Sequence, residues 1–240
     1  MAPPPAAGPH DPALAQGPPA HRAVEIAAIA SFAALAGLAA WRLATHATAA
    51  DGPRLAAAAV LGLLAADLAS GLVHWACDTW GALDTPLLGK AFLRPFREHH
   101  VDAQAITRHD FVETNGNNCL VALPVLALAL LPELGPAAPV GTFVAAWLLS
   151  LGVATMATNQ IHKWAHQDTP PPLVAALQRA RLLLPPARHA AHHRPPYAAD
   201  YCITLGWLNA PLRAIGFFGR LERAITALTG AVPRRDERAR

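Results

Sequence analysis

Apolar residues are concentrated in four long stretches of this chain, at residues 24–43, 55–77, 119–134 and 140–158. A helix needs about 20 predominantly apolar residues to cross the hydrocarbon core of a bilayer, and these stretches reach or approach that length. The pattern therefore predicts an all-α fold, an integral membrane four-helix bundle. The short link at 135–139 predicts that the last two spans form an antiparallel pair.

The second stretch differs from the others because it carries polar residues. Asp67, Gly71, His74 and Asp78 fall on one face of the predicted helix, and Ser70 lies next to Gly71. Ionisable side chains are costly inside a membrane and by default indicate function. The structural alternative is that His74 and Asp78, four residues apart, only satisfy each other.

The rest of the chain is expected to form a connection and further helices. Residues 79–118 read as a polar connection that ends at the turn signal Asn115-Gly116. The fourth span is expected to continue as a helix to His166. Between Pro211 and Gly230 apolar residues repeat at helical spacing opposite arginines. That pattern suits either a helix in the membrane interface or one packed on the protein.

These patterns divide the chain into three parts. Residues 1–22 are rich in Pro, Ala and Gly without a periodic apolar face and are expected to be a disordered leader. Residues 23–230 form the membrane-embedded domain, and 231–240 a polar tail. The sequence at 47–49 resembles a signal-peptidase site, but the apolar stretch before it begins late and runs long, which favours a membrane span.

Composition agrees with a membrane protein. The chain is 53% hydrophobic and 15% charged, with a mean hydropathy of +0.27. Its net charge of +3 comes from dispersed basic residues, which excludes a nucleic-acid-binding footprint. Cys77, Cys119 and Cys202 are far apart and odd in number, so they argue against a disulfide framework and fit a reducing compartment.

Basic residues predict how the bundle is oriented. With four spans, residues 1–22, 79–118 and the chain after 158 lie on one side, and they hold most of the Lys and Arg. The opposite loops, 44–54 and 135–139, hold only Arg54. The positive-inside rule places the first group in the cytoplasm.

Nine of the twelve histidines fall in four groups on that cytoplasmic side. The groups are His74 with Asp78; Glu98, His99 and His100, followed by His109 and Asp110; His162 and His166; and His189, His192 and His193. Prolines bracket the last group on both sides and predict a short helix of about two turns. Its histidines, at i, i+3 and i+4, can converge on one point or on two adjacent ones.

Their joint occurrence predicts a metal centre, although each group alone has a structural explanation, such as a solvated face or an interfacial anchor. Imidazole is a common ligand of transition metals, and one catalytic metal needs about three protein ligands, so eight or nine histidines with a carboxylate indicate two metals. The chain has no HExxH, CxxCH, GxGxxG or GxSxG motif. A histidine-rich site suits iron that activates dioxygen, but the spacing alone leaves zinc open.

The sequence around these histidines resembles a known family, the Kua-type lipid desaturases. The strings are Gly71-Leu-Val-His-Trp-Ala-Cys-Asp-Thr-Trp-Gly81, Arg97-Glu-His-His100, Ile106-Thr-Arg-His-Asp-Phe-Val-Glu-Thr-Asn-Gly116, Asn159-Gln-Ile-His-Lys-Trp-Ala-His166 and Tyr201-Cys-Ile-Thr-Leu-Gly-Trp-Leu-Asn209. The resemblance covers roughly residues 55–212. The family includes plasmanylethanolamine desaturase, bacterial counterparts linked to carotenoid light signalling, and a plastid desaturase acting on phosphatidylglycerol.

The resemblance implies a non-haem di-iron centre that uses dioxygen and two electrons to remove two hydrogens from a lipid chain. The expected reaction converts plasmanylethanolamine, a 1-O-alkyl ether lipid, to the vinyl-ether plasmalogen. The alternative is desaturation of an acyl chain of a phospholipid such as phosphatidylglycerol. The implied catalytic metal ligands are His74, Asp78, His99, His100, His162, His166, His189, His192 and His193.

Further residues are expected to support this centre. Candidates to orient or complete the ligands are Asp67, Glu98, His109, Asp110, Glu113 and Asn159. Candidates to hold the lipid head group are Arg94, Arg97, Arg108, Lys163 and Arg194. The chain carries no flavin or haem signature, so electrons are expected from an external protein of the cytochrome b5 or ferredoxin kind. The arginine-rich composition suggests a bacterial inner membrane, with the active site on the cytoplasmic side.

Two rival functions stay open at this point. A membrane metal carrier or sensor would also gather histidines, but it is expected to place polar residues through several spans. The first, third and fourth stretches carry almost none below their cytoplasmic ends. A zinc hydrolase or a lipid hydroxylase could use the same ligands.

Overall fold

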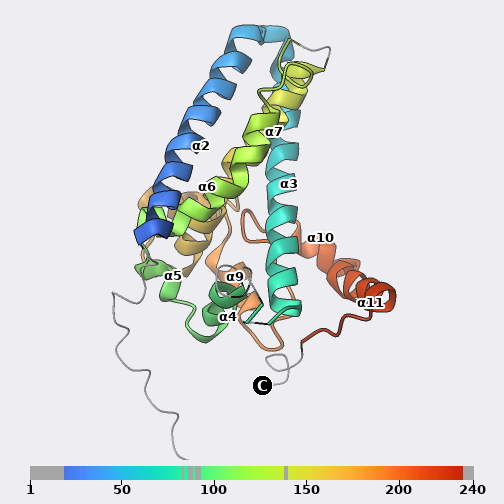
Figure 1. Ribbon diagram of the computed structural model, residues 1–240. Helices are drawn as coiled ribbons and strands as arrows, with labels where there is room; N and C mark the ends of the chain where they lie inside the picture. The colour runs from blue at the N-terminus through green and yellow to red at the C-terminus, as the bar shows by residue number, and fades with distance from the viewer. Residues whose placement is uncertain (1–18, 83, 86–88, 90–92, 138–139, 235–240) are drawn as a thin grey trace, which may run out of the picture.

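A computed structural model describes residues 19–82, 84–85, 89, 93–137 and 140–234 (Figure 1). The described residues contain helices and no strand, which confirms the predicted all-α class. Four long helices form the bundle. They are α2 (Pro19–His46), α3 (Gly52–Thr79), α6 (Phe111–Leu128) and α7 (Gly141–His166). The leader prediction falls mostly on residues outside the description, and residues 19–22 belong to α2.

Within the bundle, α3 packs on α7, and α6 packs on both α2 and α7. Small residues allow the backbones to approach closely at two of these contacts. A Cβ at Gly62 of α3 would lie 2.7 Å from the Trp147 carbonyl oxygen of α7, and one at Gly116 of α6 would lie 2.4 Å from Glu25 Cβ of α2. The Ser150 hydroxyl of α7 also donates to the Ala59 carbonyl of α3 at 2.8 Å.

Three helical segments among the described residues are long and apolar enough to cross a membrane. They are Pro19–His46, Ala49–Thr79, in which the short 3-10 helix η1 (Ala49–Asp51) precedes α3, and Gly141–His166. The third predicted span, 119–134, is displaced: α6 begins earlier and ends at Leu128. Pro132 accounts for this end, because proline has no N–H to donate to the carbonyl four residues earlier, that of Leu128, and its ring clashes with that carbonyl in a helix.

The turn predicted at Asn115-Gly116 is wrong, because both residues lie buried inside α6. The Asn115 amide donates to the Phe111 carbonyl at 3.0 Å and to Gln160 Oε1 of α7 at 3.1 Å. Packing between helices therefore overrides the local turn preference of this pair, and the absent side chain of Gly116 admits α2.

Gly116→Ala is expected to destabilise the bundle, because the new methyl group would overlap Glu25 on α2. Overpacking of this kind costs about 1–3 kcal/mol, which corresponds to a Tm lower by several degrees, roughly 2–4 °C per kcal/mol. Thermal unfolding of the detergent-solubilised protein measures it. Gly37→Ala is the matched control, because nothing lies within 4 Å of a Cβ there. Equal Tm values for the two variants would contradict the packing argument.

Shorter helices gather at the end of the bundle where α3 and α7 finish (Figure 1). They are α4 (Arg94–Val101), α5 (Ala105–Arg108), α8 (Pro172–Arg179), α9 (Pro186–His192), α10 (Asn209–Ala214) and α11 (Phe217–Thr229). The predicted continuation of α7 to His166 and the proline-bracketed helix α9 are both present. The bundle thus carries a cap of short helices at one end.

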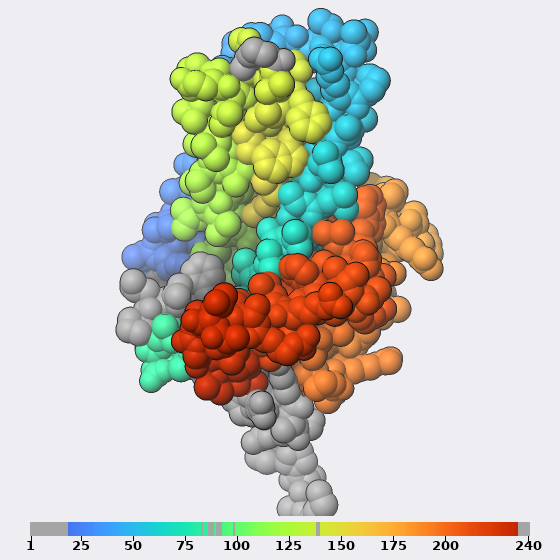
Figure 2. Space-filling model, turned by 90° about the vertical axis from the view of Figure 1, so that its right-hand side faces the viewer, coloured from blue at the N-terminus to red at the C-terminus, as the bar shows by residue number. Residues whose placement is uncertain are grey.

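The single helix predicted over 211–230 is two helices instead. Gly216 lies between them with φ +60°, a left-handed conformation that glycine adopts readily and that interrupts the helix. In α11 the Phe218 ring packs on Trp75 and Tyr201, with ring centroids 5.6 and 4.9 Å apart. Figure 2 shows this helix lying across the lower part of α3. Its place in a membrane interface stays a prediction.

Candidate metal centre

Nine side chains, eight from four helices and His193 directly after α9, meet in two clusters at the capped end of the bundle. The five-histidine cluster consists of His99, His162, His166, His189 and His193. The Asp78 cluster consists of His74, Asp78, His100 and His192. Within each cluster the potential ligand atoms lie within 4.8 Å of one another. All nine residues proposed as ligands from the sequence are therefore brought together, and they form two groups.

Helical geometry explains why the residues divide as they do. Neighbouring residues point about 100° apart around a helix, whereas residues four apart share a face. His99 and His100 of α4 accordingly enter different clusters. His189 of α9 and His193, which follows the helix, share the five-histidine cluster, and His192 enters the Asp78 cluster. The sequence left open whether these three histidines converge on one point or on two, and in the structure they converge on two.

In the five-histidine cluster the Nε2 atoms face one another at close range. His189 Nε2 lies 2.7 Å from His166 Nε2, 2.8 Å from His162 Nε2 and 3.0 Å from His193 Nε2. His166 Nε2 is also 3.0 Å from His99 Nε2. Neighbouring ligands of one ion with metal–nitrogen bonds of about 2.1 Å lie roughly 3 Å apart. The cluster therefore has the spacing of ligands around a single ion.

In the Asp78 cluster three imidazoles surround one carboxylate. Asp78 Oδ2 lies 3.4 Å from His74 Nε2, 3.5 Å from His100 Nε2 and 3.6 Å from His192 Nε2. The Nε2 atoms of His100 and His192 are 3.0 Å apart. The arrangement offers three neutral nitrogen donors and one anionic oxygen, which partly offsets the charge of a bound cation.

Two of these imidazoles are oriented from behind by backbone carbonyls. His74 Nδ1 donates to the Tyr201 carbonyl at 3.2 Å, and His192 Nδ1 donates to the Ala199 carbonyl at 2.8 Å. Because a carbonyl only accepts, each ring carries its proton on Nδ1 and points a lone pair from Nε2 into the cluster. Among the described residues, the buried His74 Nε2 has no hydrogen-bond partner. A metal ion at this position would remove that cost, so the residues fit a metal site.

Burial keeps four of these histidines neutral: His99, His189, His192 and His193. His189 and His192 are 1% and 0% exposed. Desolvation is the main cause that lowers the pKa of His192 and of His193 to about 3, and it holds the pKa of His99 and His189 well below the ordinary value. Near neutral pH these rings carry no charge, which is the state that binds a metal ion.

Several residues expected to orient the ligands lie outside both clusters. Asp67 accepts backbone hydrogen bonds from the segment after residue 203. Asp110 begins α6, where it accepts from the Glu113 N–H at 2.9 Å, and it pairs with Arg22 at 2.6 Å; both contacts lower the pKa of its carboxyl. His109 Nε2 lies 3.4 Å from Glu113 Oε1. Asp67 thus attaches residues 205–208 to α3, whereas Asp110, His109 and Glu113 connect the start of α6 with α2 and with the end of α5.

The remaining candidates also differ in their surroundings. Asn159 is half-buried on α7 outside the clusters, and the side chain of Glu98 is not among those described. Of the basic residues, Arg97 is buried and donates to the Gly81 carbonyl at 2.6 Å.

Two other basic candidates contact residues of the chain, Arg108 at the surface and Lys163 in a partly buried position. Arg108 pairs with Asp102 at 2.5 Å, and Lys163 donates to the His109 carbonyl. Arg94, Arg108 and Arg194 are exposed, and contact of any of them with a lipid phosphate stays a prediction.

Comparison with known proteins bears on the chemistry of this centre. Residues 63–236 match the family described as the lipid desaturase domain, and this range contains both clusters. The chain belongs to the lipid desaturase family. The resemblance found in the sequence is thereby confirmed.

Two relatives of this lipid desaturase share about half of its residues. Plasmanylethanolamine desaturase of Myxococcus xanthus is 56% identical over 227 residues, covering 93% of this chain and 79% of that protein. Plasmanylethanolamine desaturase 1 of Mus musculus is 51% identical over 186 residues, covering 74% and 67%. Fatty acid desaturase 4, chloroplastic, of Arabidopsis thaliana is 35% identical over 182 residues, covering 75% and 54%. No solved structure matches the chain.

Sequence reasoning missed two features of this desaturase. The carbonyls of Ala199 and Tyr201 orient two ligands, and a backbone acceptor leaves no mark in the residue type. Tyr197 stacks on the His100 ring with centroids 4.8 Å apart and planes 13° apart. The sequence did offer one signal for Tyr197: it lies four residues after His193 and directly after the second proline pair.

Proposed function

We propose that this lipid desaturase is a plasmanylethanolamine desaturase, an oxygen-dependent oxidoreductase that converts 1-O-alkyl ether lipids to vinyl-ether plasmalogens. The observation that carries the proposal is the 56% identity over 93% of the chain to an enzyme of that name. Identity to the chloroplast fatty acid desaturase is 35% over 75% of the chain. The difference favours the ether lipid over the acyl chain of a phospholipid.

The two clusters are proposed to hold two iron ions. Their donors are eight imidazoles and one carboxylate, a set that suits iron better than magnesium or calcium. When bound, iron supplies the activation of dioxygen and the removal of hydrogen from carbon. Overall, the alkyl chain loses two hydrogens to form a C=C bond, while dioxygen takes up these, two further electrons and two protons to give two water molecules.

The protein's own residues contribute ligation, orientation and exclusion of water. The Tyr201 and Ala199 carbonyls hold the rings of His74 and His192 in fixed orientations. His74 and His192 are 0% exposed, so the inner side of the Asp78 cluster is closed to bulk water. The fold would therefore contribute to catalysis by holding the reacting lipid carbon close to these fixed ligands and their metal ions.

Electrons are proposed to come from an external donor, a cytochrome b5-like or ferredoxin-like protein. The chain has no flavin or haem motif to accept them itself. Exposed Arg94 and Arg194 at the histidine end offer positive charge to a small acidic carrier as well as to lipid phosphate.

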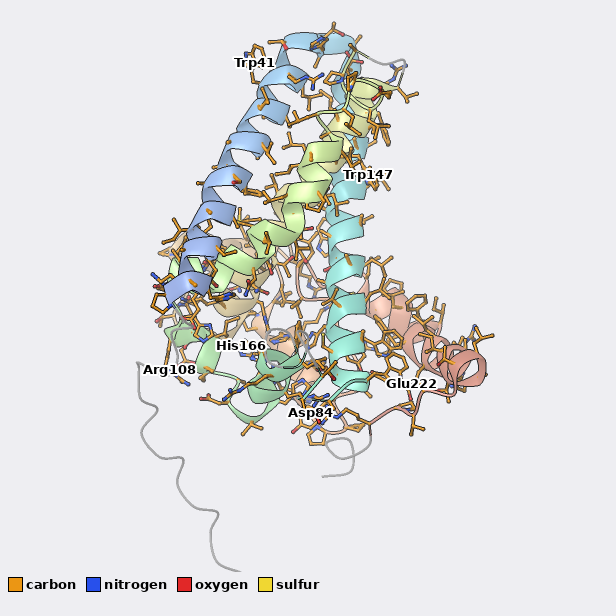
Figure 3. The ribbon with its side chains drawn as sticks, viewed as in Figure 1. Trp41, Asp84, Arg108, Trp147, His166 and Glu222 are labelled. Atoms are coloured by element: carbon orange, nitrogen blue, oxygen red, sulfur yellow. The ribbon has the colours of Figure 1, made fainter. Side chains whose placement is uncertain are left out.

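We also propose that the protein lies in a bacterial inner membrane with its site toward the cytoplasm. Figure 3 places His166 and Arg108 at the same end of the molecule and Trp41 near the opposite end. The histidine end is the one on which the sequence concentrates its basic residues, and such residues favour the cytoplasmic side.

Lipid mass spectrometry tests the proposed reaction. A bacterial host that contains alkyl ether phospholipids but no plasmalogens, and that expresses the chain, is expected to accumulate acid-labile species two hydrogens lighter than the alkyl lipid. The empty vector supplies the background. New double bonds confined to acyl chains would contradict the ether-lipid substrate, and hydroxylated products would contradict desaturation.

A further inference from the structure

The segment 199–208 lies behind the Asp78 cluster and contacts it through two carbonyls. Ala199 accepts from His192, and Tyr201 accepts from His74. Both histidines belong to the Asp78 cluster. The segment has little regular structure, yet residues 201–205 are at most 3% exposed. Its buried backbone groups therefore need partners from elsewhere in the fold.

Asp67 supplies three of those partners. Its Oδ1 accepts from the N–H groups of Leu205 at 2.8 Å and Gly206 at 2.9 Å, and its Oδ2 accepts from the Leu208 N–H at 3.0 Å. Asp67 is 0% exposed inside α3, where an ionisable side chain is expensive. Three N–H donors on one carboxylate offset that cost.

Asp67 also lies seven residues before His74, two helical turns away on the same face of α3. One helix therefore contacts the segment twice: the Asp67 carboxylate receives its N–H groups at one end, and the His74 ring donates to its Tyr201 carbonyl at the other. A shift of the segment relative to α3 would move the acceptor of His74 directly.

Three other contacts fix the segment between those points. Ser70 Oγ accepts from the Ile203 N–H at 3.1 Å. Asn209 accepts from the Cys202 N–H at 2.8 Å and donates to the Cys202 carbonyl at 2.9 Å. Gly71 admits the segment to close range, because a Cβ there would lie 2.5 Å from Cys202 Sγ. Of the hydrogen bonds that attach the segment to α3, three go to Asp67, one to Ser70 and one to His74, so Asp67 contributes the largest share.

We propose that Asp67 is a positioning residue for the Asp78 cluster: it holds the segment whose carbonyls orient His74 and His192, and so controls how tightly that cluster binds its metal ion. Asp67 is not itself a ligand, because its carboxylate oxygens face the backbone of residues 205–208. The inference concerns metal binding alone and does not depend on which lipid is desaturated.

Asp67→Asn tests the proposal, because the amide is isosteric but its NH₂ group cannot accept a hydrogen bond. One N–H of the segment then faces a donor. Metal-free protein in detergent is titrated anaerobically with Fe²⁺, and Co²⁺ serves as a spectroscopic substitute. We expect the affinity of one of the two sites to fall about tenfold or more, as when other groups that orient ligands are lost, and the affinity of the other site to stay unchanged.

Two further variants keep the test decisive. Ser150→Ala removes a hydrogen bond between α7 and α3 that does not involve the segment, so both sites should keep their affinity. Ser70→Ala removes a single contact of the segment, and it should weaken the same site by a smaller factor even if Asp67→Asn fails to fold. Equal weakening of both sites, or wild-type affinity at both in Asp67→Asn and Ser70→Ala, would overturn the proposal. Absence of vinyl-ether product from the wild-type protein with both sites filled would instead count against the proposed substrate and leave this proposal standing.

Discussion

Replacing His192 with Ala is expected to abolish lipid desaturation while the protein still inserts in the membrane. His192 is 0% exposed, and its Nε2 faces Asp78 and His100 at 3.6 and 3.0 Å. Its loss leaves the Asp78 cluster with three donors and an unfilled space beside them. Since removal of groups that only orient ligands already costs 10–100-fold, we expect a loss of activity of more than about 100-fold.

The measurement for His192→Ala combines product, metal content and membrane insertion. Product is quantified by lipid mass spectrometry, and bound metal per chain is expected to fall by about one ion, because the five-histidine cluster retains all its ligands. His46→Ala is the control, since His46 is exposed at the far end of the bundle. Full activity in His192→Ala would remove α9 from the site.

Removal of metal is expected to have an equally large effect. A chelator should abolish activity, and anaerobic addition of ferrous iron, to about two ions per chain, should restore it. Zinc should occupy the same imidazoles without restoring product, because Zn²⁺ has no redox chemistry. Conversion of lipid by the protein reconstituted with zinc alone would contradict an iron-dependent desaturase, and release of hydrolysis products would favour a hydrolase.

Which candidate ligands share a helix face could be predicted, because this depends on local helical periodicity. His162 and His166, or His189 and His193, share a face whatever the tertiary structure, and each pair does enter one cluster. The assignment of His99, His100 and His192 to particular clusters depends on how α4 and α9 are rotated about their axes. That rotation is set by packing between segments distant in the sequence, so spacing alone could not reveal it.

Other features depended on partners that the sequence does not identify. Asp67 was a candidate to orient or complete the ligands because an acidic residue in a span is unusual, but its partners are backbone N–H groups of Leu205, Gly206 and Leu208. Local preferences misled at Asn115-Gly116, where contact with α2 and α7 outweighs turn propensity. In each case a contact between distant segments decided the outcome.

The division of consecutive histidines between clusters has a consequence for the spacing of the two proposed ions. His99 and His100 are adjacent on α4 but enter different clusters, and so do His192, the last residue of α9, and His193, which follows it. Consecutive Cα atoms are held about 3.8 Å apart by covalent bonds. The covalent chain therefore limits how far apart the two proposed ions can move. This limit holds even when the helices shift relative to one another in the bilayer.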